Sequence, residues 1–160
     1  MKLKSIAAAS FAALASLSSQ AATWDFGPHG SFESNVAAVS AGGIWDTYKF
    51  SLGTTSYVES GVLGFGNIVG GAYSLYSYGA DMAYGTSDDV GIGAYIFGTT
   101  NTETLGAGSY YYTVFGGAMK ATNYFIGSQV TAVPEPETYA MLAAGLGIIG
   151  FVSSRRRRND

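Results

Sequence analysis

Three aspartates that lie close together are the first side chains whose chemistry could bind a ligand. Asp81, Asp88 and Asp89 flank the short loop 85–87, and clustered carboxylate oxygens are the ligands that a hard cation such as Ca²⁺ prefers. The spacing does not follow a calcium loop, in which alternating acids end in a distant glutamate. The stretch therefore predicts a solvated turn, with a weak extracellular calcium site as the alternative.

A fourth carboxylate, Asp46, lies in a segment at 44–52 whose side chains alternate between two faces. An unpaired buried charge is costly, so a carboxylate on the inner face needs partners. Two interpretations stay open: a ligand-binding or catalytic acid, or a structural carboxylate that accepts backbone or tyrosine hydrogen bonds, which we favour. The predicted inner face consists of Ile44, Asp46, Tyr48, Phe50 and Leu52, and the outer face of Trp45, Thr47, Lys49 and Ser51.

Signals for enzyme catalysis are sparse. A hydrolase would need paired carboxylates in one cleft, such as Asp46 with Glu59 or Asp81. His29 is the only histidine, and no serine stands in a Gly-x-Ser-x-Gly turn. The sequence has no cysteine, which excludes thiolate chemistry, disulfides and cysteine metal sites. We predict that the protein is not an enzyme and carries no cofactor.

Tyrosine offers a different chemistry. It occurs 12 times, and Tyr110, Tyr111 and Tyr112 follow one another. A tyrosine ring has a flat apolar face and a hydroxyl, which suits stacking against a sugar. Because side chains alternate along a strand, Tyr111 must point opposite to its neighbours, so some rings are expected at the surface. Exposed tyrosines predict a carbohydrate-binding module as an alternative function, although core packing explains most of these residues.

All these residues belong to the segment 22–132, for which we predict one all-β domain. Abundant glycine and aromatic residues are typical of short strands joined by tight turns. Six or seven strands predict a small antiparallel β-sandwich, with an open barrel as the alternative. The predicted strands are 44–52, 56–65, 72–78, 90–97, 110–115 and 123–130, and the predicted connections are Gly70-Gly71, 79–89, 98–109 and Gly116-Gly117.

The glycines between positions 61 and 71 predict a strand kept slim for close packing or bulges. The domain is also acidic, since two lysines against eight aspartates and glutamates give a net charge of −6. It has no basic stripe to neutralise phosphates, and we predict that it does not bind nucleic acid.

Residues 1–21 predict a signal peptide that would form a helix. Lys2 and Lys4 precede the apolar stretch 6–17, and a small-x-small exit ends at Ala21. This order of features predicts cleavage by signal peptidase after Ala21, and hence export.

Residues 133–160 predict a membrane-associated tail. A Pro-Glu-Pro segment precedes the apolar run 138–152, and four arginines follow. The run is shorter than the ~20 residues of a usual span, but we predict a transmembrane helix with its arginines on the cytoplasmic side. A hydrophobic helix packed on the domain is the alternative. The motif residues are Val133, Pro134, Glu135 and Pro136, and the anchor residues are Arg155, Arg156, Arg157 and Arg158.

This tail resembles the PEP-CTERM sorting signal of Gram-negative bacteria. The resemblance implies recognition by exosortase, an integral-membrane protease, and transport to the cell surface or exopolysaccharide matrix. The middle of the chain also resembles the FxDxF branch of that family at Ile44, Asp46 and Tyr48, although Ile44 and Tyr48 replace phenylalanines. That branch implies a small β domain without an established activity.

We therefore predict an exported, non-catalytic surface or extracellular-matrix protein. Exosortase would sort it through the tail, with a transient stage in the inner membrane. The delivered domain would be associated with exopolysaccharide or biofilm.

Overall fold

Strands form most of the computed structural model, which describes residues 21–134 and 136–156. Glycines and short polar segments separate the strands, as expected for tight connections. Their bounds are β1 Thr23–Pro28, β2 Phe32–Val39, β3 Gly42–Leu52, β4 Ser56–Phe65, β5 Ile68–Ser77, β6 Val90–Ile96, β7 Thr100–Leu105, β8 Gly108–Ala118 and β9 Thr122–Ala132.

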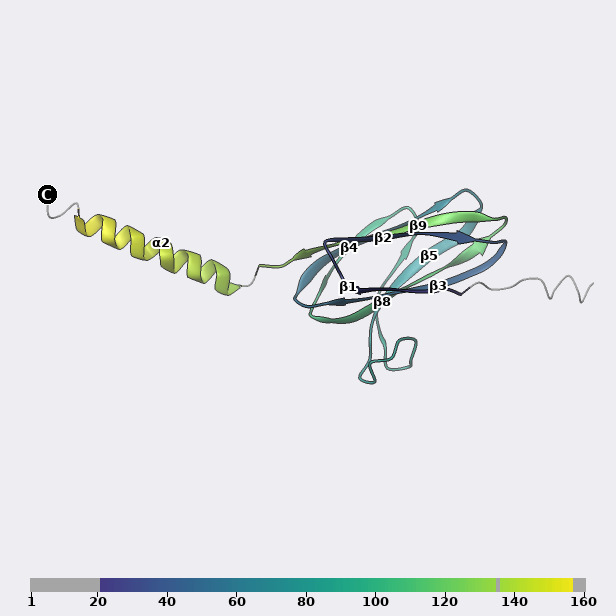
Figure 1. Cartoon of the computed structure of the whole chain (residues 1–160), viewed down its shortest axis with the longest axis horizontal. Coiled ribbons are helices and arrows are strands. Elements are labelled where there is room, and N and C mark those ends of the chain that lie inside the picture. Colours follow the sequence, from purple (N-terminus) through teal and green to yellow (C-terminus); the bar gives the residue numbers. More distant parts are fainter. Residues whose placement is uncertain (1–20, 135, 157–160) are drawn as a thin grey trace, which may run out of the picture.

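The strands form two sheets packed face to face, and the predicted sandwich is confirmed (Figure 1). One sheet has five strands in the order β1-β3-β8-β5-β6, and the other has four in the order β2-β9-β4-β7. Most pairs are antiparallel, as expected, but the edge strand β1 pairs with β3 in parallel. The chain therefore enters the five-stranded sheet at its edge and crosses to the other sheet at β2.

The core lies between the sheets and is rich in tyrosine. The alternation predicted for β3 is confirmed, because Ile44, Asp46 and Tyr48 are all at most 3% exposed. Tyrosine side chains fill the centre of the core together with aliphatic residues, and their rings supply large apolar area. The largest fully buried side chains are Tyr48, Tyr73, Tyr112, Tyr124, Leu75, Ile126, Val58, Val62 and Val114.

Three strands were absent from the sequence prediction: β1, β2 and β7. The predicted connection 98–109 was wrong, because β7 lies within it. That strand reads Thr-Asn-Thr-Glu-Thr-Leu and buries only Leu105 among its side chains. An edge strand with a polar outer face lacks the apolar alternation on which a sequence prediction depends.

Two glycine pairs that we expected to separate strands lie inside strands instead. Gly70-Gly71 belongs to β5, where the register with β8 shifts between Val69 and Ala72. A Cβ atom added at Gly71 would lie 2.5 Å from the Phe97 ring, so the ring packs directly on bare backbone. Gly116-Gly117 likewise lies within β8. The prediction that these glycines permit bulges and close packing is thus confirmed for Gly71.

After β9 the chain forms one helix, α2 (Pro136–Arg156), beyond the end of the sandwich (Figure 1). Its apolar side chains do not pack on the domain, since Met141, Leu142 and Ile148 are each more than 60% exposed. The predicted helix is present, but no helix in the described residues is long and apolar enough to cross a membrane. The run 138–152 is about 22 Å long at 1.5 Å per residue, below the ~30 Å of a bilayer core.

Candidate functional site

A groove crosses the outer face of the five-stranded sheet. Strand register brings three hydroxyl residues side by side: Thr47 on β3 pairs with Thr113 on β8, which pairs with Ser74 on β5. All three line a cavity of about 340 Å³. Within the described part of the chain, none of these three hydroxyls has a hydrogen-bond partner in the protein. None of the hydroxyl oxygens is fully enclosed either, so they border the groove. The floor of this groove can therefore donate and accept hydrogen bonds.

Aromatic side chains form both walls of the hydroxyl groove. On one side Trp45 pairs with Phe115, with ring centroids 6.1 Å apart. On the other, Tyr76 stacks on Tyr111 at 5.1 Å and 12°, and the Tyr84 ring meets Tyr111 edge-on at 5.9 Å. Trp45 is 59% exposed and Tyr84 42% exposed. The groove thus combines flat apolar walls with a floor of neutral hydroxyls.

The loop 78–89, which carries Tyr84, lies on the side of the five-stranded sheet that faces away from the other sheet (Figure 1). Asp89 organises it: one carboxylate oxygen accepts the Gly79 amide at 2.8 Å, and the other accepts the Gly85 amide at 2.6 Å and the Tyr111 hydroxyl at 2.7 Å. Although partial burial opposes the effect, these donors lower the pKa of Asp89. The loop is therefore tied to the sheet through Tyr111.

The other two aspartates of the predicted cation cluster stabilise the same loop. Asp88 accepts the Thr86 hydroxyl at 2.7 Å and the Asp81 amide at 3.2 Å, which lowers the pKa of Asp88. Asp81 accepts the Ala83 amide at 2.9 Å. In residues 21–134 and 136–156 no group of three or more His, Cys, Asp or Glu side chains could hold a metal ion. The three carboxylates thus hold the turn through hydrogen bonds within the loop.

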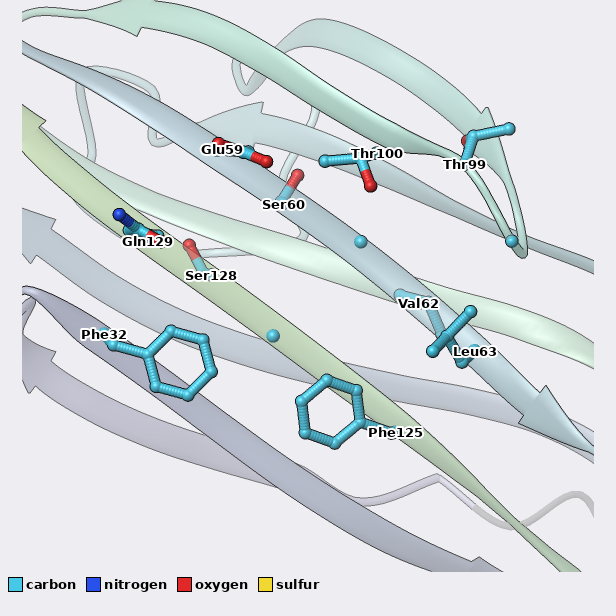
Figure 2. Close-up of a pocket in the computed structure, with 13 residues that line it drawn as sticks. Phe32, Glu59, Ser60, Val62, Leu63, Thr99, Thr100, Phe125, Ser128 and Gln129 are labelled. Atoms are coloured by element: carbon cyan, nitrogen blue, oxygen red, sulfur yellow. The ribbon is translucent and has the colours of Figure 1, made fainter.

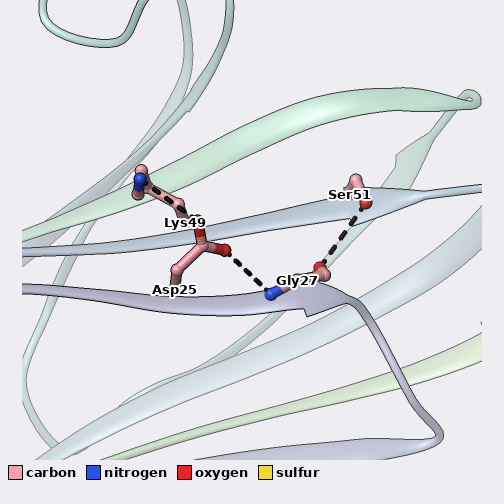
Figure 3. A network of polar contacts seen from close by, with 4 residues as sticks. All are labelled: Asp25, Gly27, Lys49 and Ser51. Carbon is pink, nitrogen blue, oxygen red and sulfur yellow. Dashed lines mark hydrogen bonds and ion pairs between the residues drawn. The ribbon is translucent and has the colours of Figure 1, made fainter.

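An ion pair lies beside the Tyr84 wall of the groove and lines a separate cavity. Lys49 lies 3.1 Å from Asp25, whose other oxygen accepts the Gly27 amide at 2.8 Å (Figure 3). The hydrogen bond from Gly27 and the Lys49 ammonium lower the pKa of Asp25, and the Asp25 contact raises the pKa of Lys49. The Lys49 nitrogen also lies 5.3 Å from the centre of the Tyr84 ring, a cation–π contact. Lys49 therefore has its charge balanced by Asp25 while it supports Tyr84.

Of the three consecutive tyrosines, Tyr111 lines the hydroxyl groove, but none is exposed as the sugar-binding prediction required. Tyr110, Tyr111 and Tyr112 are all buried, at 8%, 5% and 0% exposure. Tyr111 does point to the opposite face, as expected, but the 78–89 loop covers it. Trp45 and Tyr84, which line the groove beside Tyr111, were not singled out as sugar-binding residues from the sequence, because the register of β3 and β8 and the position of the loop decide their neighbours.

A second hollow, of about 210 Å³, lies on the outer face of the four-stranded sheet (Figure 2). Gly61 and Gly127 pair across β4 and β9 and form its floor. Figure 2 shows the Phe32 and Phe125 rings beside this floor, and a Cβ atom added at Gly127 would lie 2.9 Å from the Phe125 ring. The hollow is mainly a strip of paired backbone beside two rings.

Asp46 lies in the core and not in either groove. It is 2% exposed and accepts the Tyr124 hydroxyl at 2.5 Å and the Ala22 amide at 2.8 Å. The favoured interpretation, a structural carboxylate with backbone and tyrosine partners, is confirmed. Burial, followed by the Asp46 and Tyr48 contacts, raises the pKa of Tyr124, so its hydroxyl remains a donor.

The structure does not bring Asp46 together with the carboxylates considered for hydrolysis. Glu59 lines the hollow on the outer face of the four-stranded sheet, and Asp81 lies in the loop over the other sheet. The structure instead pairs His29 with Ser128, 2.9 Å from ring Nε2 to the hydroxyl, a contact that sequence reasoning missed. Ser128 is 2% exposed, and the pair joins the 28–31 turn to β9.

The predicted tail residues continue directly from β9. The Val133 amide donates to the Thr55 carbonyl at 3.0 Å, and Pro136 begins α2. Pro134 is exposed between them. Arg155 and Arg156 end α2. Three predicted residues, Glu135, Arg157 and Arg158, lie outside the described residues, as does the predicted signal helix up to position 20.

Comparison with solved structures finds similar folds at low identity. The periplasmic inhibitor of g-type lysozyme PliG from Aeromonas hydrophila is 10% identical, with a TM-score of 0.50 over 71% of this chain and 100% of that one. The pre-peptidase C-terminal domain of a Bacillus anthracis collagenase is 12% identical, with a TM-score of 0.49 over 67% of this chain and 94% of that one. The PliG likeness at this identity shows the fold alone.

Comparison at the sequence level is informative only for the tail. No curated protein matches the chain. The family model for the PEP-CTERM protein-sorting motif matches residues 132–158. The segment from the last residue of β9 through α2 is therefore a PEP-CTERM protein-sorting motif, which implies an exported protein that exosortase processes.

Proposed function

We propose that this chain is a non-catalytic protein of the cell surface or extracellular matrix that binds neutral polysaccharide in the hydroxyl groove. The observation that carries the proposal is the row Thr47, Thr113 and Ser74, which forms the floor of the groove between aromatic walls. The sorting motif supports delivery to the place where such a polymer occurs. The FxDxF-type branch is part of this proposal, supported by the inward position of Ile44, Asp46 and Tyr48 on β3.

The chemistry of the groove suits a sugar. A pyranose ring presents C–H groups on its faces and hydroxyls at its edge, so it can stack on Trp45 or Tyr84 while its hydroxyls meet the floor. A cavity of about 340 Å³ is within the range of small-ligand sites. The wall tyrosines also carry hydroxyls of their own.

Charge favours a neutral polymer over an acidic one. The domain carries a net charge of −6, and Lys49 beside the Tyr84 wall is already paired with Asp25. A polyanion would meet repulsion, and among the described residues no lysine or arginine lines the groove to offset it. Exopolysaccharide with neutral sugar units is therefore the proposed ligand class.

The proposed absence of catalysis rests on where the acidic side chains lie. Asp46 is enclosed in the core, and the three loop aspartates accept hydrogen bonds from the loop that they hold. Among the residues that the structure describes, no carboxylate lines the hydroxyl groove. A glycosidase requires two carboxyl groups that flank the scissile bond.

Delivery is proposed in two stages. Signal peptidase removes residues 1–21, and the tail then holds the protein at the inner membrane until exosortase acts in the motif around Pro134 to Pro136. The 21-residue helix α2 would enter the membrane with help from bilayer thinning, with the Arg155–Arg158 cluster on the cytoplasmic side. The released domain then reaches the surface or matrix.

Binding is tested with the protein purified from its host and two polymers: the host's own extracellular polysaccharide and a neutral glucan. Trp45→Ala and Tyr84→Ala should each reduce affinity at least tenfold, because each removes a stacking wall. Phe32→Ala, an aromatic deletion on the opposite outer face, is the matched control and should retain full affinity. Equal binding by all variants would reject the groove, and loss with Phe32→Ala alone would place the site in the other hollow.

Sorting is tested by the intact mass and terminal sequences of the protein in host strains with and without exosortase. The expected chain begins at Ala22 and ends near Pro134 only when exosortase is present. A chain that keeps its arginines and remains in the inner membrane in both strains would contradict the sorting proposal.

A further inference from the structure

Asp46 is a buried carboxylate without a cationic partner. It is 2% exposed, and its two hydrogen-bond donors are the Tyr124 hydroxyl and the Ala22 amide. Within the described residues no lysine or arginine pairs with it, and Lys49 pairs with Asp25. Burial of an ionised carboxylate among neutral donors is costly, so this position favours any group that can bring a positive charge.

Ala22 is held firmly beside this carboxylate. Its amide nitrogen lies 2.8 Å from Asp46 Oδ1, and its carbonyl accepts the Thr47 amide at 2.8 Å. Two residues later, the Trp24 ring stacks on Tyr48 at 4.6 Å and 7°. Ala22 is thus held beside the carboxylate by hydrogen bonds at both its amide and its carbonyl. The preceding residue, Ala21, is exposed.

We propose that Asp46 is the binding site for the α-ammonium group that signal peptidase creates at Ala22. The inference rests on the export step of the proposed function. Hydrolysis breaks the Ala21–Ala22 amide bond: water supplies the second oxygen of the Ala21 carboxylate and the two protons that convert the Ala22 N–H into an ammonium group. The Ala22 nitrogen changes from a neutral amide to an ammonium group without having to move.

This change supplies the charge that the site lacks. A charge-assisted hydrogen bond is about twice as strong as a neutral one, and the ammonium–carboxylate pair would be shielded from solvent by Tyr48 and Tyr124, both 0% exposed. The pair also connects to a hydrogen-bond chain, since Tyr124 contacts the Tyr48 hydroxyl at 2.8 Å, which accepts Asn35 Nδ2 at 3.2 Å. Processing would therefore fasten β1 to both sheets.

The test uses full-length genes expressed in the host, so that the host removes the signal. In the variant, one glycine is inserted between Ala21 and Ala22, so that cleavage after Ala21 leaves Gly-Ala22 and moves the ammonium about 3.3 Å along the chain. The Ala22 amide that contacts Asp46 is kept. Terminal sequencing first establishes the start of each mature chain; a wild-type start other than Ala22 overturns the inference.

The expected result is at least a tenfold lower folding equilibrium constant for the glycine-insertion variant, measured by urea unfolding. Asp46→Asn introduced into both chains should abolish the difference between them, because the charge partner is gone. An equal folding constant for wild type and insertion variant overturns the proposal, as does a difference that Asp46→Asn leaves unchanged.

A second measurement covers the case in which Asp46→Asn does not fold. Native wild-type and insertion proteins are treated with a limiting amount of an amine-reactive ester, and the labelled terminus is quantified by mass spectrometry. The wild-type terminus should react at least tenfold more slowly, because Asp46 and its neighbours enclose it. Equal rates overturn the proposal. Polysaccharide binding is scored separately, so loss of that function leaves this result intact.

Discussion

Tyrosines on the two faces of the five-stranded sheet perform different tasks, and the neighbours Tyr111 and Tyr112 show the contrast. Tyr112 is fully buried between the sheets, with its hydroxyl 3.1 Å from Ser128. Tyr111 points outward, stacks on Tyr76 and donates to Asp89 in the loop. The inner tyrosine joins two sheets, whereas the outer one shapes a groove. Substitutions on the inner face should therefore change stability, whereas substitutions on the outer face should change binding.

The largest effect is expected from Tyr48→Ala. This change removes a fully buried ring that contacts Trp24, Phe26 and Tyr124, and it should lower the free energy of unfolding by about 3–5 kcal/mol. Tyr84→Ala on the outer face is the comparison and should change it by less than about 0.5 kcal/mol. Urea unfolding measures both. Similar losses of unfolding free energy in the two variants would contradict the proposed difference between the inner and outer faces.

Alkaline pH should destabilise the folded protein by ionising the tyrosines that are buried between the sheets. Burial raises the pKa of Tyr48 to about 12 and that of Tyr112 to about 12. The folded state thus favours the protonated hydroxyls, so their contribution is complete below pH 10 and is lost as pH rises toward 12. Each should contribute about 1.4 kcal/mol less at pH 11 than at pH 8. Unfolding free energies at the two pH values test this, and Tyr48→Phe should reduce the dependence.

Acidic pH should instead affect the loop carboxylates on the outer face of the five-stranded sheet. The pKa values of Asp88 and Asp89 are lowered in the folded protein below 3.8 by the hydrogen bonds of the loop. Their stabilisation of the loop is therefore complete above pH 3.8 and declines as pH falls through the folded pKa values. Polysaccharide affinity should fall several-fold at pH 3 relative to pH 6 while the core stays folded. Binding measurements beside far-UV circular dichroism test this, and simultaneous loss of both signals would contradict it.

A small effect on stability is expected from Tyr111→Phe. The ring keeps its stack on Tyr76, but the hydroxyl contact to Asp89 is lost. We expect an unfolding free energy within about 1 kcal/mol of wild type and a several-fold weaker affinity because the loop is released. Tyr110→Phe, which removes only a hydroxyl bonded to the Gly106 carbonyl, is the matched control. Equal affinities of the two variants would show that the contact between Tyr111 and the loop does not contribute to binding in the groove.

Sequence patterns predicted the core more fully than the groove. The strands β3 and β4 and the inner face of β3 follow from alternation that a local window contains. The groove depends on the pairing of Thr47 with Thr113 and of Thr113 with Ser74, residues far apart in the chain. Those registers result from packing across whole sheets, and single-strand alternation cannot specify them. The parallel strand β1 was missed for a similar reason, since its partner β3 lies a strand further along.

The hydrogen bond between the Val133 amide and the Thr55 carbonyl limits the length of free chain between the β domain and α2. Only Pro134 and Glu135 separate that anchored residue from the first residue of α2, so the extended reach between the two Cα atoms is about 10 Å. A membrane enzyme that cuts in this interval must work against the surface of a folded domain, or before the last strand has paired. The junction between β9 and the sorting motif therefore makes the order of folding and tail removal a measurable property of this protein.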